Sequence, residues 1–241
     1  MRCHFLKFGN LMGSPDLKAM MRNLGDDNKA IDALWDDVAS IKLMFGLDGR
    51  STSALILAQG CPALFPALVD CSFVCADPHS FGDASVSAAI SAIESAGLNP
   101  AEIKSLFITH PHADHFDSRL LKKLPNATAY SHPDSGVAGT SPLNLKDLPK
   151  YFTALNTPGH GTPHCSFIFD FDEHDLSICF AGDLIMSHAH FLSLDQSFAF
   201  SDVAQGKESV RKLMSELDAR NTTYKMIVPG HDIPFFTHAL P

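Results

Sequence analysis

The chain has 241 residues, enough to bury the core of one large domain or two small ones. Hydrophobic residues make up 45% and charged residues 19%, as in an ordinary soluble globular protein. The net charge is −9 and no basic run occurs, which argues against a nucleic-acid partner because phosphates are bound by clustered Lys and Arg.

The N-terminal part of the chain carries no targeting signal and one unusual segment. Residues 1–13 contain no apolar stretch of signal-peptide or membrane-span length, which favours a cytoplasmic protein with reduced cysteines and no membrane partner. Residues 14–46 hold two short amphipathic stretches, which predict a helical elaboration that packs on the core. A lid over a site and a homodimer contact are the alternatives for this segment.

From residue 50 onward, the pattern predicts strands and helices in alternation. Two apolar runs around 59–62 predict a hairpin that ends at Asp70, and helical spacing predicts a helix over 85–96. The further predicted elements are a helical turn at 99–102, a strand at 105–108, a short helix at 118–124, a strand at 127–131, a loop at 132–149, an apolar segment at 151–155, a hairpin of 166–171 with 176–181, a helix at 205–219 and a strand at 225–228. This order predicts layered α and β structure, and no linker divides the chain, so residues 1–241 are predicted to form one domain.

The segment 109–115, Thr-His-Pro-His-Ala-Asp-His, is the most informative part of the chain. It follows a short apolar run, and the proline biases His110 towards an extended backbone. Side chains two residues apart in an extended chain point to the same side, so His110 and His112 can bind one ion together. Asp114 and His115 follow where the chain turns and can reach a second ion or a water. Imidazole and carboxylate are ligands for divalent metals, so a metal site is favoured over a polar loop.

Four further polar residues follow the ends of apolar segments. These residues are Asp70, His160, Asp183 and His231, and a glycine immediately precedes the last three. Glycine lets the backbone turn tightly, and ligands at strand ends are held by a rigid scaffold, as a metal site requires.

With these residues in this order, the chain resembles the metallo-β-lactamase superfamily from about residue 50 to residue 232. The resemblance implies an α/β fold: a four-layer αββα sandwich of two mixed β-sheets with a dinuclear metal site. By the same resemblance, the first ion would be held by His110, His112 and His160, and the second by Asp114, His115 and His231. Asp183 would bridge the two ions, and Asp70 would orient ligands from behind. The ions would be zinc, although iron, manganese and nickel accept the same donors.

The resemblance also implies a reaction. Two ions lower the pKa of water from 15.7 towards about 7, and the resulting hydroxide attacks a small ester, lactone or thioester. Asp114 would be the catalytic carboxylate that orients the nucleophile and relays its proton. Asp183 stands where typical dinuclear antibiotic-degrading enzymes have cysteine, so penicillin hydrolysis is not expected.

Three alternatives stay open. The segments 158–164 and 228–234 are similar to those of a small metallo-β-lactamase-domain group that includes an RNA-cleaving member. Phosphodiesterase activity is therefore the first alternative. Persulfide dioxygenases share the Thr-His-x-His-Ala-Asp-His pattern but use one iron. A metal-binding module without turnover is the third alternative. His164, His188 and His190 are candidates for a substrate pocket, and the alternative for them is a solvent-facing loop.

Overall fold

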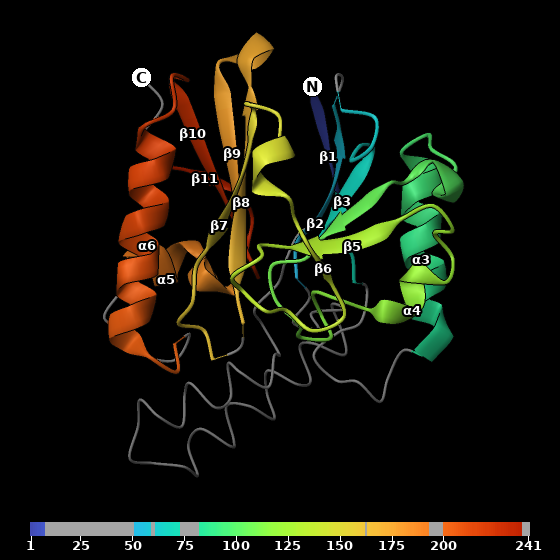
Figure 1. The fold of residues 1–241 in the computed structure, drawn as a ribbon, viewed down its shortest axis with the longest axis horizontal. Helices are drawn as coiled ribbons and strands as arrows, with labels where there is room; N and C mark the ends of the chain where they lie inside the picture. The colour runs from blue at the N-terminus through green and yellow to red at the C-terminus, as the bar shows by residue number, and fades with distance from the viewer. Residues whose placement is uncertain (8–50, 59–60, 73–81, 162, 193–199, 238–241) are drawn as a thin grey trace.

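The computed structural model describes residues 1–7, 51–58, 61–72, 82–161, 163–192 and 200–237. Two β-sheets face each other, and helices lie on the outer face of each (Figure 1). The predicted elaboration at 14–46 lies outside the described residues. Within the described ranges, no helix combines the length and apolarity needed to span a membrane.

Within the described residues, the first sheet has six strands in the order β1-β2-β3-β4-β5-β6. Its strands are β1 (Arg2–Lys7), β2 (Ser53–Leu57), β3 (Ala67–Val69), β4 (Ser105–Phe107), β5 (Thr128–Ser131) and β6 (Ser141–Pro142). The pairs β1/β2 and β2/β3 are antiparallel, which confirms the predicted hairpin before Asp70. The remaining neighbours are parallel.

In the part of the chain that the structure describes, the second sheet has five strands in the order β11-β10-β9-β8-β7. Its strands are β7 (Phe152–Asn156), β8 (Cys165–Phe171), β9 (Leu176–Gly182), β10 (Tyr224–Pro229) and β11 (Phe235–Phe236). The β8/β9 pair is the predicted second hairpin, whereas β9 and β10 run parallel. Parallel strands bring their carboxyl ends to one edge of the sheet, and this edge carries the candidate site.

Helices cover both outer faces and produce the four layers (Figure 1). The first sheet is covered by α3 (Gly82–Ser95) and α4 (Ser118–Leu121), and the second by α5 (His188–Leu192) and α6 (Val203–Asp218). The short 3-10 turns are η1 (Pro100–Glu102), η2 (Leu145–Asp147), η3 (Asp172–His174) and η4 (Asp183–Ile185). In α6, Val210, Leu213 and Leu217 recur at helical spacing and are buried against the second sheet.

Three hydrophobic clusters hold these layers together. The cluster between the sheets is rich in phenylalanine: Phe152 stacks on Phe169 with ring centroids 4.5 Å apart, and Phe107 from the opposite sheet lies 4.8 Å from Phe152. The two outer clusters join each sheet to its helices. This arrangement confirms the predicted αββα sandwich of two mixed sheets.

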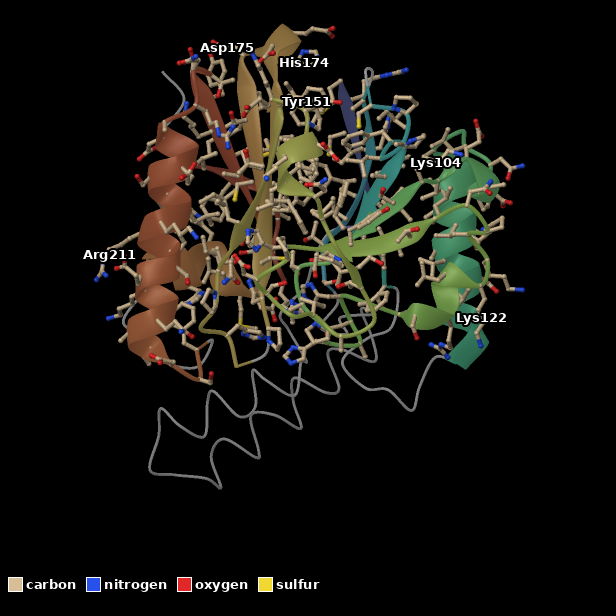
Figure 2. All side chains as sticks on the ribbon, in the orientation of Figure 1. Lys104, Lys122, Tyr151, His174, Asp175 and Arg211 are labelled. Atoms are coloured by element: carbon tan, nitrogen blue, oxygen red, sulfur yellow. The ribbon has the colours of Figure 1, made fainter. Side chains whose placement is uncertain are left out.

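The structure adds elements that the pattern did not predict. Strand β1 lies in residues 1–13, with Cys3 and Phe5 packed towards the core between the sheets. The predicted loop at 132–149 contains β6 and η2, and β11 follows the last predicted strand. Charged side chains such as Lys104, Lys122 and Arg211 point away from the body (Figure 2). Asp175 and Asp183 stand at opposite ends of β9, so the edge with Asp175 in Figure 2 lies away from the candidate site.

Candidate metal centre

The predicted metal-ligating residues meet at the edge where β4, β9 and β10 end. The parallel β9/β10 register pairs Pro229 with Gly182, so the loops that carry His231 and Asp183 start side by side. The parallel β3/β4 register pairs Val69 with Phe107 and places Asp70 beside Thr109. The loop after β7 brings His160 to the same place.

The side chains form two groups of potential ligands. In each group, the ligand atoms all lie within 4.8 Å of one another. The first group is His110, His112, His160 and Asp183, and the second is Asp114, His115 and His231. In the first group, His112 Nδ1 lies 3.0 Å from His110 Nε2 and 3.3 Å from His160 Nε2. In the second, His231 Nε2 lies 3.3 Å from Asp114 Oδ2.

Asp183 connects the two groups. Its Oδ2 lies 3.7 Å from His110 Nε2 and 3.3 Å from His160 Nε2. Its Oδ1 lies 3.1 Å from His115 Nε2 and 3.3 Å from His231 Nε2. Each oxygen of this buried carboxylate therefore faces a different group, and within the described chain neither oxygen has a well-formed hydrogen bond.

These spacings fit metal ions. Nitrogen and oxygen ligands lie about 2.0–2.2 Å from zinc, so two ligands of a tetrahedral ion stand roughly 3.3 Å apart. A buried carboxylate surrounded by imidazoles and left without hydrogen bonds is costly unless cations balance it. The residues at this edge therefore fit a pair of divalent ions with Asp183 between them.

The buried carboxylates and imidazoles of the site shift one another's pKa values. Burial alone would lower the pKa of His115, but the carboxylates of Asp183, Asp114 and Asp70 hold it well above the ordinary value. Burial would raise the pKa of Asp183, but the surrounding imidazoles, His231 first, hold it well below the ordinary value. For His110, burial and the neighbouring His115 hold the pKa well below its usual range, so its imidazole is neutral and able to bind a metal.

Asp70 fixes the orientation of two histidines from behind. Its backbone is left-handed at φ 46°, an unusual conformation for a residue with a side chain. One carboxylate accepts hydrogen bonds from Thr109 N at 2.8 Å, Thr109 Oγ1 at 2.7 Å and His115 Nδ1 at 2.9 Å. Because the Thr109 hydroxyl donates to Asp70, His110 Nδ1 donates to that hydroxyl at 3.0 Å. Both histidines therefore direct Nε2 at the site, and this nitrogen binds a metal once it carries no proton.

Glycine is required where the backbone passes behind Asp183. A Cβ added to Gly230 would overlap Asp183 Oδ1. Gly182 has φ 55°, and a Cβ there would meet Thr109 Oγ1 at 2.7 Å and His164 Nε2 at 2.8 Å. The glycines seen in the sequence before Asp183 and His231 therefore make room for the ligand set itself.

The three histidines predicted for a substrate pocket lie in different surroundings. His164 is fully buried, with Nδ1 2.9 Å from Thr157 Oγ1 and its ring centroid 5.2 Å from that of His110. His190 is also buried, and its Nδ1 accepts from Met186 N at 3.2 Å. His188 is exposed and stacks on Phe235 at 4.3 Å. Helix α5 replaces the loop expected around His188 and His190 and explains this difference, while contact with a substrate stays a prediction.

The sequence reasoning missed several hydroxyl groups behind the site. Ser51, Thr52 and Ser53 donate to backbone oxygens of three loops that carry candidate ligands or Asp70. Ser72 Oγ also donates to Ala113 O at 2.6 Å. Serine and threonine before a strand are common in turns, so the only available signal was three consecutive hydroxyl residues.

Burial of His190 has a consequence for stability at acid pH. Burial lowers the pKa of His190 to about 4. Between the unfolded pKa of about 6.5 and this folded value, the unfolded chain binds a proton that the folded chain does not, so stability falls as the pH falls. In metal-free protein, the stability advantage of wild type over His190→Gln should shrink by about 1.4 kcal/mol per pH unit in this window. Urea unfolding of both proteins between about pH 6.5 and about pH 4.5 measures the difference in their free energies of unfolding. A difference that stays constant over this range would contradict the expectation.

Solved structures resemble this chain, whereas comparison of its sequence with known proteins found no match. No family model matches the sequence, and no curated protein matches it. A metallo-β-lactamase candidate from Thermotoga maritima is similar with a TM-score of 0.59 and 15% identity, over 98% of each chain. AidC, a dizinc quorum-quenching lactonase, gives a TM-score of 0.55 and 16% identity over 79% of this chain and 76% of its own. The metallo-β-lactamase FIM-1 from Pseudomonas aeruginosa, in its mono-zinc form, gives 0.56 and 17% over 80% and 81%. Together with the two sheets and their flanking helices, these similarities show that the chain has the metallo-β-lactamase fold.

Proposed function

We propose that the protein is a dinuclear metal-dependent hydrolase of small esters, lactones or thioesters. The observation that carries this proposal is the position of Asp183, with one oxygen facing each of two groups of potential ligands. Two divalent ions held there would act as Lewis acids and lower the pKa of water towards about 7. Zinc is the ion proposed, because imidazole and carboxylate at these spacings suit it.

The side chains divide the work as follows. His110, His112 and His160 would hold the first ion, and Asp114, His115 and His231 the second, with Asp183 shared. Asp70 keeps the Nε2 atoms of His110 and His115 directed inward. The Asp114 side chain is 12% exposed, against 1% for Asp183, and so is the carboxylate better placed to exchange a proton with solvent or substrate. We assign it the role of orienting the nucleophile and passing its proton to the leaving group.

Exposed apolar side chains on two segments that flank the second group support a substrate with a hydrophobic part. Ile233 follows His231 by two residues, so their Cα atoms lie within about 7 Å. Ile233 is 63% exposed and Leu192 on α5 is 73% exposed. The segments that carry them are joined where His188 N donates to Asp232 Oδ2 at 3.1 Å. Solved structures with this fold include a dizinc lactonase and an N-acyl homoserine lactone hydrolase with N-hexanoyl-L-homoserine bound, so lactones are the first substrates to test.

A substrate panel tests the proposed function. Zinc-loaded protein is expected to hydrolyse lactones, aryl esters or thioesters, to lose this activity on removal of zinc by a chelator, and to regain it when zinc returns. Cleavage of bis-p-nitrophenyl phosphate alone would replace the proposal with a phosphodiesterase. Oxygen uptake with glutathione persulfide in iron-loaded protein would replace it with a dioxygenase. Protein that binds metal but turns over none of these compounds would indicate a binding module.

A further inference from the structure

Three consecutive residues at the start of β2 contact three separate loops of the candidate metal centre. We call Ser51, Thr52 and Ser53 the hydroxyl seam. All three are buried, with exposed fractions of 0%, 4% and 0%. Buried hydroxyls need hydrogen-bond partners, and here these are backbone oxygens beside the candidate ligands.

Each residue of the seam reaches a different loop. Ser51 Oγ donates to the backbone oxygen of Asp114, and Ser53 Oγ donates to that of Asp70. Thr52 bonds on both sides of His231: its N–H donates to Gly230 O at 2.8 Å and its Oγ1 to Asp232 O at 3.2 Å. The partners lie 17 to 180 residues away in the chain, so the seam joins segments that no local structure connects.

Ser51 and Thr52 bond to the backbone at or beside two ligands of the second group, although the segment 109–115 that holds Asp114 also carries His110 and His112 of the first group. Ser51 holds the backbone at Asp114, and Thr52 holds the backbone on either side of His231. Ser53 holds Asp70, which accepts a hydrogen bond directly from His115. The three members of the second group are therefore each fixed, directly or through Asp70, by one residue of the seam.

The loop with His160, in the first group, has a different support. Ser209 Oγ, on α6, donates to Pro158 O at 2.6 Å, and Ser201 N donates to Gly159 O at 2.9 Å. Gly159 also lies so close to α6 that a Cβ on it would overlap Gly206. Helix α6 thus holds the His160 loop of the first group, while Ser51 and Thr52 hold the backbone at Asp114 and on either side of His231.

We propose that Ser51 and Thr52 of the hydroxyl seam position the second metal site and set the affinity for the ion there separately from the first. This inference rests on the proposed two-ion function. The seam does not touch the reacting atoms. It acts by fixing the backbone from which Asp114 and His231 extend. Removal of one hydroxyl takes a hydrogen-bond donor away from the backbone oxygen that it contacts, which loosens that loop.

The test is a stepwise metal titration of metal-free full-length chain with Zn²⁺ against a chromophoric chelator, repeated with Co²⁺ by absorption spectroscopy. The variants are Ser51→Ala, Thr52→Val and Ser209→Ala. Thr52→Ser keeps the hydroxyl and serves as the conservative variant. Ser177→Ala is the matched control, because this buried hydroxyl bonds to Asp170 at 2.7 Å near the opposite end of β9.

We expect Ser51→Ala and Thr52→Val to weaken the second binding step by about 10- to 100-fold, with the first step unchanged. Ser209→Ala should weaken the first step instead, while Thr52→Ser and Ser177→Ala should behave as wild type. The unfolding midpoint of each metal-free protein identifies a variant that merely fails to fold. If Ser51→Ala fails to fold, the result for Thr52→Val decides whether the proposal holds. Equal weakening of both steps by Thr52→Val, or none, would overturn the proposal.

Wild-type protein separates this inference from the proposed function. Two binding steps without hydrolysis of any panel compound would contradict the function, while the variants would still decide the role of the seam. Two steps with hydrolysis but no selective effect of the variants would overturn the seam alone. Fewer than two steps in wild type would overturn both.

Discussion

The Asp183→Asn protein is expected to lose at least about 10³-fold in kcat/KM and to bind both ions more weakly. The substitution keeps the shape of the side chain but removes the charge that faces four imidazoles at 3.1 to 3.7 Å. The NH2 of the asparagine amide cannot replace a carboxylate oxygen as a metal ligand. One of the two groups of potential ligands therefore loses a ligand atom. Metal content after dialysis and kinetics at saturating zinc measure the two effects.

Asp172→Asn is the control for Asp183→Asn. Asp172 is exposed in η3, at the opposite end of β9 from Asp183. It should keep the metal content and activity of wild type. An Asp183→Asn protein that retains two ions per chain and activity within about tenfold of wild type would show that Asp183 does not bridge.

The Gly230→Ala protein is expected to lose about 100-fold or more in kcat/KM. The added Cβ would overlap Asp183 Oδ1, so either the carboxylate or the loop that carries His231 must move. The backbone at Gly230 is also held by Gly182 O at 3.1 Å and Ile185 O at 3.0 Å, which limits how far it can retreat. A displacement of about 1 Å at a catalytic group is enough for a loss of this size.

Gly136→Ala is a control in which the added Cβ meets no atom; Gly230 is not among the glycines with positive φ, so its variant adds the clash alone. Gly136 has φ 69°, and a Cβ there would meet no atom within 4 Å. Gly136→Ala should therefore lower stability by roughly 1–2 kcal/mol with unchanged activity per folded molecule. Equal activities of the two variants, measured per bound metal, would refute the steric account of Gly230.

The strand ends and the candidate ligands could be predicted because their signals are local. His110 and His112 are two residues apart in extended chain, and Gly182 and Gly230 mark tight turns directly after strands. The family resemblance implied two mixed sheets, but the parallel pairing of β9 with β10, which places Asp183 beside His231, was not predicted.

The remaining features depend on contacts between distant segments. Strand β1 pairs with β2 across about 50 residues, and its alternation of Cys3 and Phe5 with polar residues is too short to distinguish it from coil. Ser51 and Thr52 look like ordinary turn residues until the loops of Asp114 and His231 are placed beside them. His190 was expected in a loop, and its burial follows from how α5 packs on η4 beside Asp183.

The central claim is that two divalent ions bind per chain, with Asp183 between them. Elemental analysis of wild-type protein, reconstituted with Zn²⁺ and freed of excess metal, tests it most directly. Two zinc ions per chain in wild type, and fewer in Asp183→Asn, is the predicted result. One ion or none in wild type, or equal zinc in both proteins, would contradict the two-ion site.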